Sequence, residues 1–210
     1  MTLRLCVFGV AALSAPALAI QIGTRDTFQD LTAQDWFGAS PVNVASGGPA
    51  GASDAFLQST SVGGSGPGSR LAIYNGEPRW VGDYLAAGVT ALETDMVNFG
   101  STTLEMRAVF FSASGARYTS RNAQLLAADG QWHHLTFNLD SASLFSVLGS
   151  DTYAQCMSNV SRVMFRHDAG APSSTGTAIA TVAGFDNITA VPAPAGFLAL
   201  GALALVRRRR

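Results

Sequence analysis

Short segments in which apolar and polar residues alternate recur through the middle of this 210-residue chain, and they constrain its fold more than any other feature. The clearest of these segments are residues 104–111, 132–139, 160–166 and 178–191. Alternation with a period of two is the pattern of a β-strand with one buried face. Turn residues such as Asn75-Gly76 and Asp129-Gly130 separate the segments, and no regular series of helices lies between them. The pattern therefore predicts an all-β domain, an antiparallel β-sandwich of the jelly-roll type.

A few stretches within this domain depart from the alternating pattern. Residues 143–148 and 151–157 are expected to be short helices. Two tracts rich in glycine and serine, residues 45–53 and 61–69, are expected to be loops on either side of a strand at 54–60. Neither tract is followed by the Gly-Lys-Ser/Thr of a phosphate-binding loop, so no nucleotide site is predicted.

The charged residues are few and unevenly distributed. All 13 basic residues are arginine, which excludes chemistry that depends on a lysine. Removing Arg4 and the four arginines at the C-terminus leaves 8 arginines against 14 acidic residues, a formal charge of about −6 for the central region. A nucleic-acid-binding domain needs a basic surface that displaces counterions, so this balance argues against nucleic acid as a partner.

Residues 1–19 have the organisation of a secretory signal peptide. Arg4 supplies a positive charge, residues 5–13 form an apolar run, and Ala17-Leu18-Ala19 matches the small-residue site at which signal peptidase cuts. We therefore expect that the protein is exported and that signal peptidase is one of its partners. Cleavage after Ala19 would leave the β-sandwich domain at residues 20–190, followed by a tail at residues 191–210.

The tail combines an extended start, an apolar middle and a basic end. Pro192 and Pro194 hold the chain extended, residues 195–206 are twelve apolar residues, and the chain ends in Arg207, Arg208, Arg209 and Arg210. A twelve-residue helix is roughly 18 Å long, against roughly 30 Å for the hydrocarbon core of a bilayer. Snorkelling arginines extend its reach, and the positive-inside rule places them in the cytoplasm. The tail is expected to anchor the protein in the membrane, transiently or permanently, with the domain on the outer side.

With the signal peptide, this arrangement of prolines, apolar helix and arginine cluster resembles the PEP-CTERM class of bacterial surface proteins. The resemblance covers about the last 20 residues of the chain. It implies that a membrane peptidase of the exosortase type recognises the tail, cuts it near the prolines and leaves the domain in the cell envelope or outside the cell. The class is named for Pro-Glu-Pro, whereas this chain has Ala193 between the two prolines. A simple membrane anchor that is never cut is the alternative.

Several segments of the central region resemble carbohydrate-binding jelly rolls of the laminin-G and laminin-IV type. Residues 26–30, followed by Trp36, resemble the opening strand, residues 129–135 resemble the Asp-Gly-x-Trp-His hairpin, and residues 185–188 resemble the closing strand. In many such jelly rolls a structural calcium ion joins the first and last strands. The resemblance therefore implies that Asp26, Asp30 and Asp186 supply carboxylates to a calcium ion, which prefers oxygen ligands. No other cofactor is expected.

The candidate ligand-contacting residues are aromatic. They are Trp36, Trp80, Tyr84 and Trp132. The first three are expected to form one aromatic group near the ligand. Trp132 shares a strand face with His134, and the two would form a surface on which a sugar stacks; packing of Trp132 at a hairpin is the alternative.

No catalytic residue is assigned from the sequence. A glycosidase needs two carboxylates that face each other across a cleft. Glu93 and Asp95 share a strand face, and Glu105 is expected opposite them on a neighbouring strand, but an outward polar sheet face explains the same pattern. The sequence therefore favours an exported, non-catalytic protein of the cell surface or extracellular matrix that binds glycans, with extracellular polysaccharide as its partner. A polysaccharide hydrolase or lyase and a structural surface protein without a small ligand are the alternatives.

Overall fold

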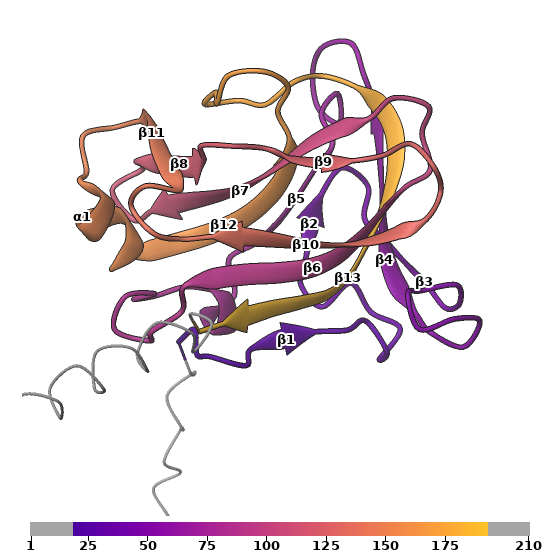
Figure 1. The fold of residues 1–210 in the computed structure, drawn as a ribbon, viewed down its shortest axis with the longest axis horizontal. Helices are drawn as coiled ribbons and strands as arrows, with labels where there is room; N and C mark the ends of the chain where they lie inside the picture. The colour runs from indigo at the N-terminus through magenta and orange to yellow at the C-terminus, as the bar shows by residue number, and fades with distance from the viewer. Residues whose placement is uncertain (1–18, 193–210) are drawn as a thin grey trace, which may run out of the picture.

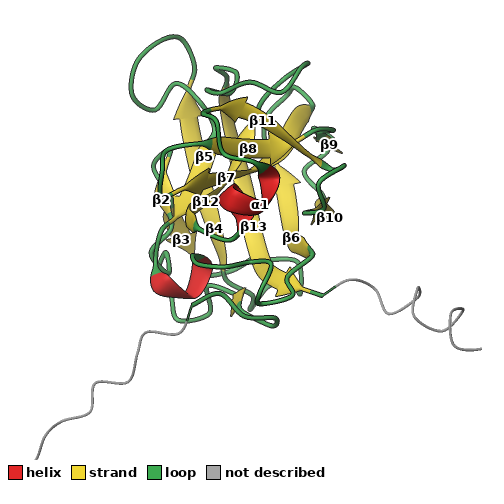
Figure 2. Ribbon diagram, turned by 90° about the vertical axis from the view of Figure 1, so that its left-hand side faces the viewer, coloured by secondary structure: helices red, strands yellow, loops and turns green. Residues whose placement is uncertain are grey.

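The chain folds as a sandwich of two antiparallel β-sheets, as a computed structural model that describes residues 19–192 shows (Figure 1). Residues 1–18 of the predicted signal peptide and residues 193–210 of the predicted tail lie outside the described residues. The strands of the sandwich are β1 (Arg25–Asp26), β2 (Phe37–Gly38), β3 (Val42–Val44), β4 (Phe56–Val62), β5 (Ala72–Asn75), β6 (Ala91–Asn98), β7 (Leu104–Ser112), β8 (Arg117–Ser120), β9 (Gln124–Leu126), β10 (Trp132–Asn138), β11 (Leu144–Leu148), β12 (Val160–His167) and β13 (Ala180–Val191). The helical segments are α1 (Tyr153–Met157) and a 3₁₀ turn at Pro78–Trp80, drawn in red in Figure 2. The predicted β-sandwich is confirmed.

Each sheet takes its name here from its central strand. The β13 sheet has the order β10-β6-β13-β4-β3, with β1 paired to β13. The β7 sheet has the order β11-β8-β7-β12-β5-β2, with β9 paired to β7. The first and last strands meet, since Asp26 of β1 pairs with Ile188 of β13. Within residues 19–192, no helix is long and apolar enough to span a bilayer.

The alternating pattern of each strand decides which side chains enter the core between the sheets. Leu104, Met106, Ala108 and Phe110 of β7 are all buried in one hydrophobic cluster. That cluster also contains Val163 and Phe165 of β12 and Leu135 and Phe137 of β10, as the alternation predicts. The intervening residues of the same strands therefore form the outer faces of the two sheets.

Three local expectations need correction. Residues 144–148 form strand β11, not a helix, because Leu144, Phe145 and Ser146 pair with β8 and this pairing overrides a weak local pattern. The opening strand ends at Asp26, because the backbone at Phe28 adopts a φ of 59° and leaves the sheet. The strand predicted at 54–60 is β4 at 56–62. The second predicted helix is present as α1, and Thr152 caps it with a capping box to Gln155.

Candidate ligand-binding face

A row of side chains crosses the outer face of the whole β7 sheet. Cross-strand pairing places its members side by side in the order Phe145, Thr119, Val109, Met164, Tyr74 and Phe37. The two aromatic residues at the β2 end are in contact, with ring centroids of Phe37 and Tyr74 6.1 Å apart. Phe37 is 55% exposed, which leaves its ring available to a ligand.

Arginine side chains stack on the aromatic rings beside this row. The guanidinium carbon of Arg162 lies 4.8 Å from the ring centroid of Tyr74 and 5.2 Å from that of Phe111. Arg117 lies over the other side of the same cluster, 4.7 Å from the Phe111 centroid. Cation–π contact fixes the orientation of these flexible side chains. We call the surface formed by Phe37, Tyr74, Phe111, Arg162 and Met164 the platform.

Gly38 explains why Phe37 can stand beside Tyr74. It has a φ of 133°, and a side chain there would collide with the carbonyl oxygen of Ala72 on β5. Only glycine allows the two strands to approach this closely with this backbone conformation. The glycine therefore holds the short edge strand β2 against β5 and the Phe37 ring at the end of the platform.

The loop at residues 168–176 crosses the middle of the same face, and we call it the strap. Arginines of the sheet donate hydrogen bonds to its carbonyl oxygens: Arg107 to Asp168 and Gly170, Arg166 to Ser173 and Ser174, Arg117 to Ser174 and Arg70 to Gly176. Because Arg166 and Arg117 stand on either side of Val109 in the sheet and share Ser174, the strap passes above Val109. That valine is fully buried, as this arrangement requires.

A neighbouring loop borders one side of the platform. A groove of about 260 Å³ lies beside Tyr74 and Met164 and is bordered by Arg70 and by Gly66 and Gly68 of the loop between β4 and β5. A larger hollow of about 490 Å³ opens beyond Phe37 and is bordered by polar and charged side chains: Asp30, Thr32, Gln34, Asp35 and Arg79. An open surface with flat rings, hydrogen-bond donors and acceptors suits an extended polar chain better than a compact small molecule.

The prediction that three aromatic core residues form a ligand site is wrong. Trp36, Trp80 and Tyr84 are at most 1% exposed and belong to the hydrophobic core. The Trp36 and Trp80 rings contact each other with centroids 5.7 Å apart, and Tyr84 packs on Phe110. These three residues therefore hold the sandwich together and offer no ring to a ligand at the surface.

Trp132 lies on the outer face of the other sheet, where the structure favours the packing alternative. Its indole Nε1 donates a hydrogen bond to the carbonyl oxygen of Gly47 at 3.0 Å, and its ring meets Phe56 edge-on at 5.2 Å. Gly184 lies beneath these rings, and a side chain there would collide with Val97. The neighbouring His134 places Nδ1 2.8 Å from Asp95 Oδ1. Both residues share a face as predicted, but the Trp132 ring is largely occupied by its own neighbours.

The carboxylates predicted for calcium do not come together. Asp26 is buried, where Trp36 and Trp80 donate their indole N–H groups to Oδ2 at 2.8 and 2.7 Å, and Arg79 donates to Oδ1 at 3.2 Å. N–H donors thus fill the positions that a cation would need. Asp30 lies in a loop and Asp186 on the outer face of the β13 sheet, and no group of three or more His, Cys, Asp and Glu residues in the described part of the chain could hold a metal ion.

The carboxylates considered for a hydrolase are also divided between the two sheets. Glu93 and Asp95 share the outer face of β6 as predicted, whereas Glu105 lies on β7 in the opposite sheet. The expected opposition across one cleft is therefore wrong for Glu105. Its carboxylate instead accepts a hydrogen bond from the backbone of Gly170 in the strap, at 2.8 Å.

Asp186 stands next to Asp95 on the outer face of the β13 sheet but is fully buried. Its Oδ1 accepts the backbone N–H of Asn187 at 2.7 Å, and its Oδ2 has no hydrogen-bond partner in the described structure. Burial raises the pKa of Asp186 to about 7; the Asn187 N–H opposes this, and the nearby carboxylates of Asp54 and Asp95 add to it. An enclosed carboxyl of this kind has no access to a substrate.

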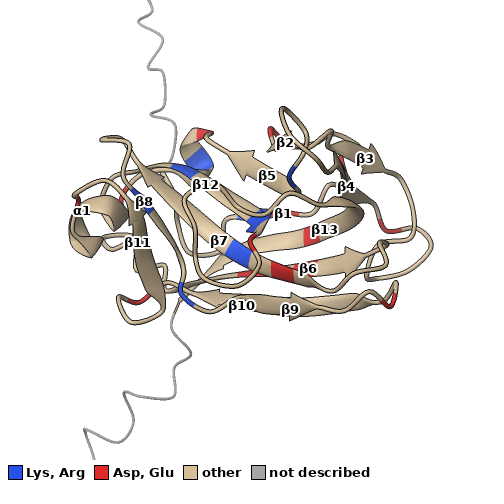
Figure 3. Cartoon of the chain, turned by 90° about the horizontal axis from the view of Figure 1, so that it is seen from above, with Lys and Arg blue, Asp and Glu red and all other residues tan. Residues whose placement is uncertain are grey.

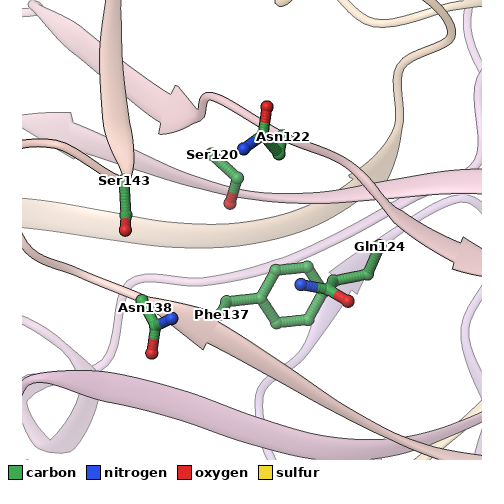
Figure 4. Close-up of a pocket in the computed structure, with 6 residues that line it drawn as sticks. All are labelled: Ser120, Asn122, Gln124, Phe137, Asn138 and Ser143. Atoms are coloured by element: carbon green, nitrogen blue, oxygen red, sulfur yellow. The ribbon is translucent and has the colours of Figure 1, made fainter.

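A small polar pocket opens at the edge of the sandwich between β10 and the β8–β9 region (Figure 4). Its lining residues are Ser120, Asn122, Gln124, Phe137, Asn138 and Ser143. Its volume is about 100 Å³, room for roughly three water molecules at about 30 Å³ each. The platform is therefore the better candidate for a saccharide.

Sequence reasoning missed most residues of the platform. The alternation over residues 160–166 puts Arg162 and Met164 on the face opposite the buried Val163 and Phe165, but it indicates no binding role for them. The signal that could have found the site is an aromatic residue at an outward position of a strand, as at Phe111 and Phe37. Their convergence depends on the order of strands in the sheet, which the sequence does not reveal.

No protein-family model matches this sequence, and no curated protein matches it. Solved structures do resemble the fold. A family 11 carbohydrate-binding module from Clostridium thermocellum, solved with a β-1,3-1,4-mixed-linked tetrasaccharide, superposes with a TM-score of 0.51 at 14% identity, covering 81% of this chain and 96% of the module. A second carbohydrate-binding module, CBM28, is specific for non-crystalline cellulose. It superposes with a TM-score of 0.52 at 13% identity, covering 84% of this chain and 99% of the module.

Part of a much larger enzyme shares the fold as well. An exo-β-agarase matches with a TM-score of 0.55 at 14% identity over 80% of this chain, but only 24% of the agarase is covered. The likeness is one of fold. Structures with this fold therefore include separate carbohydrate-binding modules and part of a larger enzyme.

Proposed function

We propose that this protein is an exported, non-catalytic glycan-binding protein and that its ligand lies on the platform of the β7 sheet. The observation that carries the proposal is the exposed Phe37 ring in contact with Tyr74, next to a groove of about 260 Å³ on an open sheet face. Flat rings bind the apolar faces of sugar rings, and neighbouring polar groups bind their hydroxyls. The likeness in fold to two carbohydrate-binding modules, each covered almost entirely, supports the same function.

The signal peptide and tail of the sequence support a location at the cell surface or in the extracellular matrix. In this proposal signal peptidase removes residues 1–19, and the tail that begins near Pro192 holds the protein in the membrane until an exosortase-type enzyme cuts it. Mass spectrometry of the mature protein from its native host tests this part. A mature chain that still ends at Arg210 would contradict processing and leave glycan binding untouched.

Truncating the platform rings should weaken glycan binding without unfolding the protein. We expect the Phe37→Ala and Tyr74→Ala variants to bind their polysaccharide about tenfold more weakly, because truncation of a central aromatic contact typically costs about 1–2 kcal/mol. Affinity gel electrophoresis against soluble polysaccharides, followed by calorimetry on the best ligand, measures the change.

The matched control is Phe99→Ala. Phe99 is 48% exposed, similar to Phe37, but it packs against Phe56 of the β13 sheet. This variant should bind as the unmodified protein does. Equal losses for Phe99→Ala and Phe37→Ala, or no loss for either platform variant, would place the ligand elsewhere.

A further inference from the structure

The arginines of the domain are concentrated on one face although the domain as a whole is acidic. Among the 8 arginines within residues 19–192, six occupy outward positions on the β7 sheet or directly beside its strands: Arg70, Arg107, Arg117, Arg121, Arg162 and Arg166. Two carboxylates, Glu105 and Asp168, lie among these arginines, and Asp30 and Asp35 border the hollow at the Phe37 end. In Figure 3, where arginine is blue and the acidic residues are red, blue segments lie on β7 and beside β8. The face that carries the platform is therefore positively charged.

Five of these six arginines are engaged within the protein. Four of them hold the strap, and Arg121 donates to the carbonyl oxygens of Ala142 and Leu144. The two carboxylates are engaged as well: Asp168 accepts from Arg166 Nη2 at 3.0 Å, and Glu105 accepts from Gly170. Both carboxylates thus bind the strap or an arginine that holds it, and neither forms an ion pair with Arg162 within the described residues.

Arg162 differs from the other arginines of this face. Within the described residues its guanidinium has no hydrogen bond and no ion pair, and it is exposed. It is nevertheless held in place, because it stacks on Tyr74 and Phe111 at 4.8 and 5.2 Å. A guanidinium that aromatic rings orient, with its donors free, is arranged to bind a carboxylate or sulfate through paired hydrogen bonds.

We propose that the glycan bound on the platform is acidic and that Arg162 binds its carboxylate or sulfate groups while Tyr74 and Phe37 contact its sugar rings. This inference rests on the proposed glycan-binding function and specifies its ligand class. The carboxylates Asp30 and Asp35 border the hollow beyond Phe37, so the anionic groups lie at the Arg162 end of the platform. The acidity of the rest of the domain is no obstacle, since it belongs mainly to other surfaces and is screened beyond about 10 Å at moderate salt.

The test compares three polysaccharides with the purified mature protein. Polygalacturonate carries carboxylates, a sulfated galactan carries sulfates, and mixed-linkage β-glucan is neutral. We expect at least one acidic polymer to bind about tenfold more tightly than the neutral one, with an affinity that falls as NaCl rises from 20 to 300 mM. The acidic polymer that binds better identifies the anionic group.

The decisive variant is Arg162→Gln, which keeps a polar side chain of similar length but removes the charge. It should lose about tenfold or more in affinity for the acidic polymer and lose most of the salt dependence. The matched control is Arg25→Gln, which replaces an exposed arginine on β1 of the other sheet. It should change neither the affinity for the acidic polymer nor the salt dependence of that affinity. Thermal melting of both variants confirms that the fold is retained.

The outcomes separate the two proposals. Tighter binding to the neutral polymer, together with an unchanged affinity of Arg162→Gln, would overturn the acidic-ligand inference while leaving glycan binding in place. Failure to bind any of the three polymers and a wider glycan array would overturn both.

Discussion

Replacing Asp26 with alanine should lower the free energy of unfolding by about 3–5 kcal/mol, the range for removing one partner of a buried charged network. The Asp26 carboxylate accepts hydrogen bonds from Trp36, Trp80 and Arg79 in the interior of the sandwich. Alanine would leave two indole N–H groups without an acceptor and Arg79 without one of its two carboxylate partners, and it would also create a cavity beside the two rings. Urea denaturation monitored by tryptophan fluorescence measures the loss.

The control for this prediction is Asp35→Asn. Asp35 also contacts Arg79, at 3.2 Å, but its side chain is 54% exposed. It has a φ of 62°, a conformation that asparagine tolerates well. Because exposed ion pairs contribute about 0–1 kcal/mol, this variant should have a free energy of unfolding close to that of the unmodified protein. If Asp26→Ala lowered the free energy of unfolding as little as Asp35→Asn does, the buried hydrogen-bond network around Asp26 would not be what joins β1 to the core.

Replacing Asp186 with asparagine should remove a pH-dependent loss of stability. Burial raises the pKa of this carboxyl from 3.8 to about 7, so the folded protein keeps a proton that the unfolded chain releases. Stability from this group is complete below about pH 4 and is lost as the pH rises through about 7. A shift of about three pKa units corresponds to about 4 kcal/mol in total, of which about 2–3 kcal/mol falls between pH 5 and pH 7.

The measurement is the difference in unfolding free energy between the Asp186→Asn variant and the unmodified protein at pH 5, 6, 7 and 8. That difference should increasingly favour the variant as the pH rises and should level off above pH 7. Asp129→Asn is the control, because hydrogen bonds from the Gln131 backbone and His133 lower the pKa of Asp129, which is therefore ionised throughout this range. A difference for Asp186→Asn that does not change with pH would show that the carboxyl is already ionised in the folded state.

The sequence predicted the fold because its strongest signal is local. In β7, β10 and β12 the alternation of apolar residues was sufficient to assign both the strand and its buried face. One error arose where the decisive interaction is distant in the sequence, and the other where the backbone itself turns out of the strand. Residues 144–148 became a strand through pairing with β8, and the opening strand stopped at Asp26 because the backbone turns at Phe28.

The binding site was harder to predict for the same reason. The sequence analysis predicts Trp36 and Trp80 as ligand contacts, yet both donate hydrogen bonds to the buried Asp26 carboxylate. The platform instead uses a phenylalanine of the two-residue strand β2 and a tyrosine of β5, which no local pattern distinguishes from core residues. A binding role for Arg162 follows only from the fold, which places Tyr74 and Phe111 beside its guanidinium.

The central claim is that a glycan binds the outer face of the β7 sheet, and NMR chemical-shift mapping with the best-binding oligosaccharide tests it most directly. The account predicts that the perturbed signals belong to Phe37, Tyr74, Phe111, Arg162 and Met164 and to the strap at residues 168–176. Signals of Trp132, His134 and Phe99 on the β13 sheet should stay unchanged. Perturbation centred on Trp132 and His134, with the platform silent, would contradict the account.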